Sequence, residues 1–278
     1  MLSLLNKVPE QYEKSLSLIK FKIKKKKINN ILFCGMGASG IVGDIIKEYL
    51  YDEIKVPIIV NKNDSIPNFV DKNTLVFIIT HSGKTKEVLK CYNKAKLKKA
   101  IIMGITANKN LKIKNKILIP DNEYGRVVLY YSLFPILKIL NRFGLIKNKD
   151  EEIKKALNAV KNFKDRKKAE IIAKKLYKKT PVIYSYFNYR AVGYYWKTQL
   201  NELSKVYALQ NFFPDVNHNE IEVNNLNNFE VVNLKEKKIS LASIVYYMYS
   251  ADWVAYYLSQ IRKVNPLKTP VIDRIKRK

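Results

Sequence analysis

Short apolar runs alternate with longer segments of helical periodicity through the first half of the chain. The apolar runs do not alternate with polar residues, which is typical of strands that are buried on both faces of a parallel sheet. We therefore predict an α/β fold for this half. The predicted strands are 31–34, 56–60, 75–80, 100–105 and 117–119, and the predicted helices are 41–50, 84–98 and 126–143.

The second half contains a similar mixture of patterns. A charged helical stretch, 151–179, is expected to join the halves, and we place the division at 1–146 and 147–278. The stretch is followed by a predicted strand at 181–186, a helix at 189–203 and a strand at 229–234. Apolar residues from Leu241 to Leu258 then recur every three or four positions, which predicts a long helix with one buried stripe.

Two segments of the chain can be considered as a membrane span and as a signal peptide, and neither fits. The nearly charge-free segment 240–260 approaches the length of a membrane span, but Asp252 and several tyrosines interrupt it. Charged residues from Lys7 to Lys14 exclude a signal peptide at the start of the chain. The two cysteines, Cys34 and Cys91, are too few for a disulfide framework. We expect a cytoplasmic protein with no membrane partner.

The net charge of +28 allows two interpretations. A basic cluster at 22–27 and the basic end of the chain are features that nucleic-acid-binding proteins also show. However, lysines occur on almost every predicted surface helix, which favours a generally lysine-rich surface, so no nucleic-acid partner is expected. A milder alternative is that the positive field steers anionic substrates, in which case catalytic efficiency would fall with added salt.

A glycine-rich loop follows the first predicted strand. Four of the nine glycines lie between positions 35 and 43, and Ser39 adds a hydroxyl group. Such a loop lets backbone amides approach an anion at a helix N-terminus, although an ordinary tight turn is the alternative. The loop also matches the dinucleotide-binding pattern G-x-G-x-x-G. The second strand, however, is followed by Asn61 and Lys62, with only Asp64 nearby to bind a ribose.

A second loop with hydroxyl groups, Thr80 to Thr85, follows the third predicted strand. A helix cap would account for one of its three hydroxyl groups, whereas a phosphate monoester needs several short donors. These two loops together favour a phosphate site over a dinucleotide site. The two histidines, His81 and His218, are too few to indicate a metal site, so we expect neither a metal nor another cofactor.

Motifs in the second half extend this interpretation. They are Asn-Glu-Leu-Ser-Lys at 201–205, Phe-Pro-Asp-Val-Asn-His-Asn-Glu-Ile at 213–221, Asp-Trp at 252–253 and Thr-Pro-Val at 269–271. With the two loops, they resemble the archaeal-type bifunctional phosphoglucose/phosphomannose isomerases over nearly the whole chain. The resemblance implies two sugar-isomerase-like halves, each a parallel sheet flanked by helices. It also implies interconversion of glucose 6-phosphate and mannose 6-phosphate with fructose 6-phosphate, and a homodimer.

The resemblance also implies roles for individual residues. Phosphate and substrate would be bound by the two loops and by a hydroxyl residue that leaves room for both C2 epimers. Proton transfer would fall to Glu202, ring opening to His218 with Lys276, and stabilisation of developing charge to Arg126. The implied binding residues are Gly37, Ala38, Ser39, Thr80, Ser82, Thr85 and Thr269.

The chain departs from the family pattern at several positions. Ala38 replaces a usual glycine, Thr80 and His81 replace a serine-tyrosine pair, and Lys84 and Lys86 replace an amide and an acid. About one strand-helix unit is missing between Leu234 and Leu241, so the second half is expected to be shortened.

From the residues alone, alternatives remain open. Glu202 could be a surface glutamate paired with Lys205, and His218 could be a structural residue bonded to its neighbours. Arg126 could pair with Asp121 or Glu123, and Lys276 could be solvated in a basic tail. The whole chain could instead be a non-catalytic sugar-phosphate sensor of a regulator, or a nicotinamide-dependent dehydrogenase built on the glycine loop.

Overall fold

The computed structural model describes residues 1–121, 125–223 and 227–277, and the chain divides into two compact units. We call residues 9–153 the N-unit and residues 1–8 with 154–278 the C-unit. The division falls inside helix α6 (Asp150–Lys161), whereas the sequence placed it at 146/147. Helix α1 (Leu2–Asn6) belongs to the C-unit because it packs on α9 (Leu241–Ile261), where Tyr249 donates a 2.9 Å hydrogen bond to the carbonyl of Leu5.

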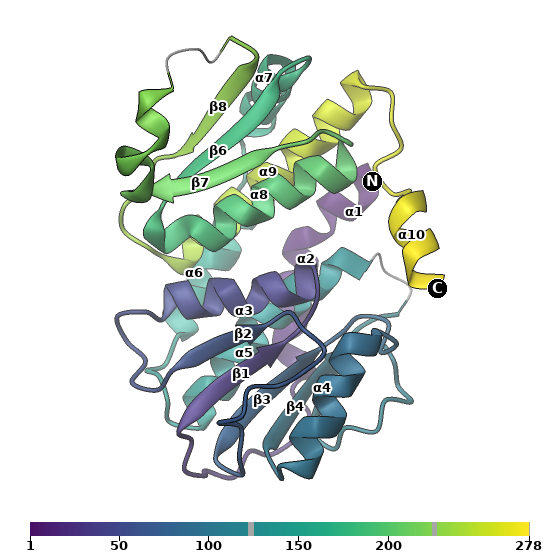
Figure 1. Ribbon diagram of the computed structural model, residues 1–278, viewed down its shortest axis with the longest axis vertical. Coiled ribbons are helices and arrows are strands. Elements are labelled where there is room, and N and C mark those ends of the chain that lie inside the picture. Colours follow the sequence, from purple (N-terminus) through teal and green to yellow (C-terminus); the bar gives the residue numbers. More distant parts are fainter. Residues whose placement is uncertain (122–124, 224–226, 278) are drawn as a thin grey trace. The chain divides into compact units, whose positions relative to one another are not determined.

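The N-unit contains a parallel five-stranded sheet in the order β2-β1-β3-β4-β5 (Figure 1). All five strands coincide with predicted apolar runs, and the central strands β1 and β3 are almost entirely buried, as that pattern requires. The strands are β1 (Asn30–Cys34), β2 (Ile58–Asn61), β3 (Thr74–Ile79), β4 (Ile101–Thr106) and β5 (Lys116–Leu118).

Helices cover both faces of the N-unit sheet. Helices α3 (Ala38–Tyr49) and α5 (Val128–Arg142) pack against each other on one face. On the other face, α4 (Lys86–Leu97) buries Val88, Cys91 and Ala95 against residues of β1 and β3. Helix α2 (Val8–Ser15) adds Tyr12, whose ring lies 4.9 Å from that of Phe134 in α5. Both cysteines are buried and free.

The C-unit contains a smaller parallel sheet in the order β7-β6-β8. Its strands are β6 (Thr180–Tyr186), β7 (Leu209–Phe213) and β8 (Phe229–Leu234). The expected shortening of the second half is therefore confirmed. Strand β7 was not predicted, because Gln210 and Asn211 interrupt its apolar residues and leave no clear period.

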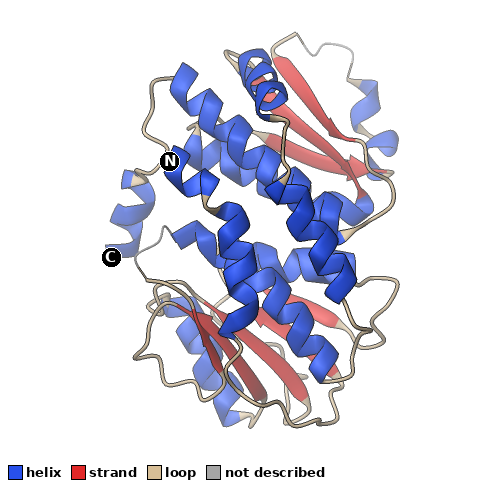
Figure 2. Ribbon diagram, turned by 180° about the vertical axis from the view of Figure 1, so that it is seen from behind, coloured by secondary structure: helices blue, strands red, loops and turns tan. Residues whose placement is uncertain are grey.

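Three helices of the C-unit lie on one face of its sheet (Figure 2). They are α7 (Arg166–Leu176), α8 (Arg190–Leu203) and α9, and they enclose the fully buried rings of Trp196, Trp253 and Tyr195. The predicted charged helix at 151–179 is in fact two helices, α6 and α7. None of the helices in the described parts of the chain is long and apolar enough to cross a membrane.

The connection from β7 to β8 passes to the other side of β6 in short turns rather than a long helix. These turns are η4 (Asp215–His218) and η5 (Glu220–Glu222). Another short turn, η3 (Phe187–Tyr189), precedes α8, and α10 (Pro270–Arg277) is the last helix. Ser185 of β6 lies against Gly193 of α8, so its neighbour Tyr184 points to the other face of the sheet, where it bonds to Glu220 of the segment that contains His218.

Candidate active site

Two loops of the N-unit meet where the order of its strands reverses. Strands β1 and β3 are parallel neighbours, with Cys34 opposite Ile78 at their carboxyl ends. From there the chain continues to β2 on one side and to β4 on the other. Such a reversal leaves a crevice outside the carboxyl ends of the two strands, and ligands of open α/β sheets bind there. Residues 35–40 and 80–85 both border this crevice.

The glycine loop folds tightly onto the start of α3. Gly37 caps the helix with a φ of +54°, a backbone conformation that favours glycine. A Cβ atom on Gly40 would lie 2.6 Å from the carbonyl oxygen of Gly35, so a side chain cannot be accommodated there. Ala38 begins the helix and Ser39 is buried beside it. The loop thus brings Gly37, Ala38 and Ser39 to the positive end of a helix dipole, where an anion is stabilised.

The second loop pairs two of its three hydroxyl groups. The Oγ1 atoms of Thr80 and Thr85 lie 3.1 Å apart, and Thr80 is buried. Thr85 occupies the N-cap position of α4, yet its side chain makes no capping hydrogen bond. The Oγ of Ser82 accepts a 3.2 Å hydrogen bond from the backbone N–H of Lys84. Helix capping therefore does not explain why threonine stands at position 85.

Arg126 lies near the second loop. It occupies the short turn η2 (Gly125–Val127), which directly precedes α5 and follows β5. A Cβ atom on Gly125 would lie 3.9 Å from the ring of His81, so this turn is adjacent to the loop. The proposed partner Glu123 lies outside the described residues. The N-unit therefore gathers the glycine loop, the hydroxyl loop and Arg126 at one edge of its sheet.

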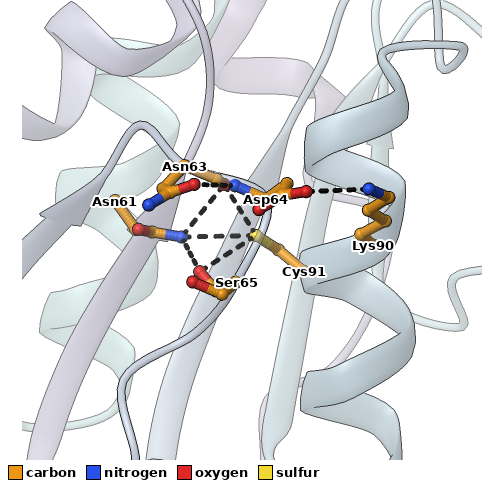
Figure 3. A network of polar contacts seen from close by, with 6 residues as sticks. All are labelled: Asn61, Asn63, Asp64, Ser65, Lys90 and Cys91. Atoms are coloured by element: carbon orange, nitrogen blue, oxygen red, sulfur yellow. Dashed lines mark hydrogen bonds and ion pairs between the residues drawn. The ribbon is translucent and has the colours of Figure 1, made fainter.

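The end of β2 does not resemble a ribose-binding site (Figure 3). The side-chain amide of Asn61 donates a 2.7 Å hydrogen bond to the carbonyl of Ser65 and contacts the sulfur of Cys91 at 3.2 Å. Asp64, the acidic residue that could have bound a ribose, forms a 2.7 Å ion pair with Lys90. These side chains hold the loop after β2 against α4, so the dinucleotide interpretation lacks its acidic residue.

The C-unit places Glu202 at the end of α8, where the side chain is half-buried. The neighbouring Asn201 accepts a 3.1 Å hydrogen bond from the backbone of Ala208 through its side chain. The ammonium group of Lys205 donates a hydrogen bond to the backbone carbonyl of Glu202. The Asn-Glu pair is thus fixed at the turn between α8 and β7.

Lys205 is a residue whose structural importance the sequence did not reveal. Its ammonium group also donates a 2.7 Å hydrogen bond to the carbonyl of Lys268. The residue after Lys268 is Thr269, so Lys205 ties the segment with Thr269 to the end of α8 and to Glu202. A positive φ of +58° at Lys205 turns the chain sharply there. In the sequence, only its place at the end of the Asn-Glu-Leu-Ser-Lys motif, 201–205, indicated that Lys205 matters.

His218 lies at the opposite end of the C-unit sheet from Glu202. Because α8 runs antiparallel to the strands that it covers, its last residues precede the start of β7, while η4 follows the end of β7 (Figure 1). Five residues of strand separate the two turns, a length of about 16 Å. His218 is exposed, as expected for a residue on a turn. One C-unit therefore does not bring these two residues together.

Two further residues of the predicted site, Lys276 and Thr269, lie near the end of the chain. Lys276 lies in α10, but its side chain is outside the described parts of the chain. Thr269 is half-buried immediately before that helix. Within the described residues, no group of three or more histidine, cysteine, aspartate or glutamate side chains is placed to hold a metal ion.

Comparison with protein families identifies both units. The SIS domain family matches residues 22–123. The family described as the bacterial phospho-glucose isomerase C-terminal SIS domain matches residues 165–238 and 223–278. The two segments of this second match overlap over residues 223–238, which contain β8, so β8 is matched twice, in agreement with a strand-helix unit that this chain lacks.

Similar proteins of known name cover nearly the whole chain. A bifunctional phosphoglucose/phosphomannose isomerase of Thermoplasma acidophilum is 31% identical, over 90% of this chain and 89% of that protein. One from Aquifex aeolicus is also 31% identical, over 88% of this chain and 89% of that protein. A third, from Caldicellulosiruptor bescii, is 29% identical over 326 residues, covering 98% of this chain and 96% of that protein. This last alignment is longer than the chain, so that relative has additional residues.

Solved structures show the same fold at low sequence identity. The C-terminal domain of glucosamine-fructose-6-phosphate aminotransferase from Francisella tularensis has a TM-score of 0.73 at 15% identity, over 96% of this chain and 97% of that chain. Tagatose-6-phosphate ketose/aldose isomerase from Escherichia coli has a TM-score of 0.70 at 13% identity, over 95% of this chain and 93% of that chain. The predicted α/β architecture of sugar-isomerase halves is confirmed.

Proposed function

Because the chain belongs to the bifunctional phosphoglucose/phosphomannose isomerase family, we propose that it interconverts glucose 6-phosphate and mannose 6-phosphate with fructose 6-phosphate. The observation that carries this proposal is the meeting of the glycine loop and the hydroxyl loop at the strand reversal of the N-unit. A phosphate monoester needs several short donors and a favourable helix end, and these loops supply both.

In this proposal the protein binds the substrate mainly through its phosphate group. The α3 N-terminus with Gly37, Ala38 and Ser39 takes some of the phosphate oxygens, and the hydroxyl groups of Thr80, Ser82 and Thr85 take others. Binding energy from this group, which does not react, fixes the carbon atoms that do. Thr269 leaves room for either configuration at C2, so both epimers react.

Glu202 is the base that transfers the proton. Its carboxylate removes the C2 proton of the open-chain aldose and returns a proton to C1. A proton also passes from the C2 hydroxyl to the C1 oxygen, so that C1 becomes the alcohol and C2 the ketone. The intermediate is an enediolate, whose negative charge Arg126 stabilises. The half-buried position of Glu202 at the end of α8 limits the access of water to this carboxylate.

His218 is proposed to open the sugar ring, with Lys276 assisting it. Since His218 and Glu202 lie at opposite ends of β7, a complete site takes Glu202 from one copy of the chain and His218 from another. This arrangement requires at least a homodimer with two equivalent sites.

The central experiment measures isomerisation and proton transfer in the same samples. We expect fructose 6-phosphate to form from both aldose phosphates and to incorporate deuterium from the solvent. Glu202→Gln should reduce turnover and deuterium exchange by at least about 10³-fold, because the amide cannot accept the proton. Its affinity for fructose 6-phosphate should change by less than about threefold, since the phosphate loops are intact. Binding by the native protein without any exchange would instead identify a sugar-phosphate sensor.

A complementation experiment tests the shared site. Glu202→Gln and His218→Asn chains should each be nearly inactive alone. When the two are produced together, half of the dimers are mixed, and each mixed dimer has one site with both native residues. The mixture should therefore recover about a quarter of the native activity. If coproduction restores no activity while mixed dimers are present, the two residues do not act in one shared site.

A further inference from the structure

The connection that carries His218 is fastened to the C-unit sheet by a residue that has no role in the reaction proposed above. That residue is Glu220, at the start of η5 and two positions beyond His218. One carboxylate oxygen of Glu220 accepts a 2.6 Å hydrogen bond from the hydroxyl of Tyr184 in β6. The other oxygen accepts a 2.6 Å hydrogen bond from the side-chain amide of Asn211 in β7. Glu220 thus bonds to two neighbouring strands at once.

Both donors are held in orientations that suit this carboxylate. The side-chain oxygen of Asn211 already accepts a 2.9 Å hydrogen bond from the backbone N–H of Phe212, which directs its NH₂ group to Glu220. Burial and the hydrogen bond to Glu220 raise the pKa of Tyr184 to about 12. The hydroxyl of Tyr184 therefore keeps its proton, and remains a donor, to a more alkaline pH than an ordinary tyrosine does.

The segment between the sheet and Glu220 is short and internally bonded. It leaves β7 at Phe213, whose ring lies 5.8 Å from the ring of Tyr184. The buried side chain of Val216 anchors its middle, and the side chain of Asn219 accepts a hydrogen bond from the backbone of Glu220. Tyr184 therefore contacts both ends of a segment in which His218, like Asn217 and Asn219 beside it, is exposed.

We propose that Glu220 is a positioning residue for His218, because its carboxylate fixes the far end of the turn that presents the imidazole. This inference rests on the ring-opening role proposed for His218. A carboxylate that accepts two hydrogen bonds is a strong anchor, since bonds to a charged acceptor are stronger than those between neutral groups. A catalytic group displaced by about 1 Å can lose up to about 10²-fold in rate, so this anchor has a direct effect on turnover.

The principal test removes the anchor and leaves the rest of the turn. Glu220→Ala should reduce kcat for the cyclic hexose phosphates by about 10- to 100-fold and change KM by less than about twofold. The matched control is Glu222→Ala, which removes an exposed carboxylate two positions further along the same turn. The control should keep kcat within about twofold of the native value. Equal effects of the two substitutions would overturn the proposal.

A double variant separates positioning from general stability. When His218 is already Asn, the added Glu220→Ala substitution should change kcat by less than about twofold, because there is no imidazole left to position. A loss as large as in the native background means that Glu220 acts elsewhere, and this also overturns the proposal. Tyr184→Phe removes only one of the two hydrogen bonds and should give a smaller loss of kcat in the same direction. This variant provides the test if Glu220→Ala fails to fold.

Failure of the role proposed for Glu220 can be distinguished from failure of the proposed isomerase function. If the native protein does not isomerise hexose phosphates, the function itself is wrong. If the native protein is active, Glu202→Gln is inactive and Glu220→Ala behaves as Glu222→Ala does, only the role of Glu220 is wrong.

Discussion

The parallel strands of the two sheets are buried to different extents and by different arrangements of helices. In the N-unit, helices cover both faces, and every residue of β3 is buried. In the C-unit, α7, α8 and α9 share one face, and β7 and β8 remain half-exposed along most of their length. The second sheet has three strands against five in the first.

The difference shows which part of the fold the second half could lose. No strand lies between β8 and α9, a stretch that the structure describes in full and where the strand-helix unit of relatives was expected, and β6 is still paired on both sides, by β7 and β8. The turns that carry His218 connect β7 to β8 and are retained. The N-unit therefore has a core on each face of its sheet, whereas the C-unit has its core on the one face that α7, α8 and α9 cover.

The largest stability effect is expected from the central strand of the N-unit. Phe77 is completely buried in β3, and its ring stacks on that of Phe33 at 4.8 Å. Phe77→Ala should lower the free energy of unfolding by about 3–5 kcal/mol, because it removes a large, fully buried side chain and leaves a cavity. The matched change in the other sheet, Val231→Ala in half-exposed β8, should lower it by only about 1 kcal/mol.

Chemical denaturation with peptide-resolved hydrogen exchange measures both changes and assigns each to its sheet. Comparable losses from Phe77→Ala and Val231→Ala would mean that the second sheet is as closely packed as the first, and the contrast between the sheets would then fail.

The next largest effect should come from the helix layer of the C-unit. The buried carboxylate of Asp252 in α9 accepts a 2.6 Å hydrogen bond from Tyr195 and another from Gln199, both in α8. Asp252→Ala should lower the free energy of unfolding by about 2–4 kcal/mol, because it removes the acceptor from buried donors. Both tryptophans lie in this layer, so the shift should appear in a fluorescence-detected melt. Asp252→Asn, which keeps one acceptor oxygen and nearly the same volume, should lose less; losses as large as those of Asp252→Ala would show that the amide oxygen does not replace the carboxylate.

The smallest effect is expected on the opposite face of the C-unit sheet and at alkaline pH. Burial and Glu220 raise the pKa of Tyr184 from 10.0 to about 12 in the folded state. The stabilisation from this neutral hydroxyl is complete below about pH 10 and is lost as the pH rises through about 12. The stability difference between the native protein and Tyr184→Phe should therefore shrink over this range. A constant difference would argue against the hydrogen bond to Glu220.

Much of the fold could be predicted because burial on both faces leaves a simple pattern. The five N-unit strands, β6, β8 and α9 were all indicated by apolar runs or by helical periodicity. Strand β7 could not be predicted, since an edge strand with Gln210 and Asn211 lacks both patterns. The membership of residues 1–8 in the C-unit was also hidden, because it depends on contacts with α9, far away in the sequence.

For the site, the sequence alone determined which chemical groups are available: a glycine loop, a hydroxyl loop, and the motifs that contain Glu202 and His218. Local spacing encodes these because each loop must follow a strand and precede a helix. Only the tertiary structure decided their arrangement, including the strand reversal that joins the loops, the tie from Lys205 to Lys268, and the separation of Glu202 from His218. The physical reason is that strand order and long-range hydrogen bonds depend on how distant segments pack, which a linear pattern does not record.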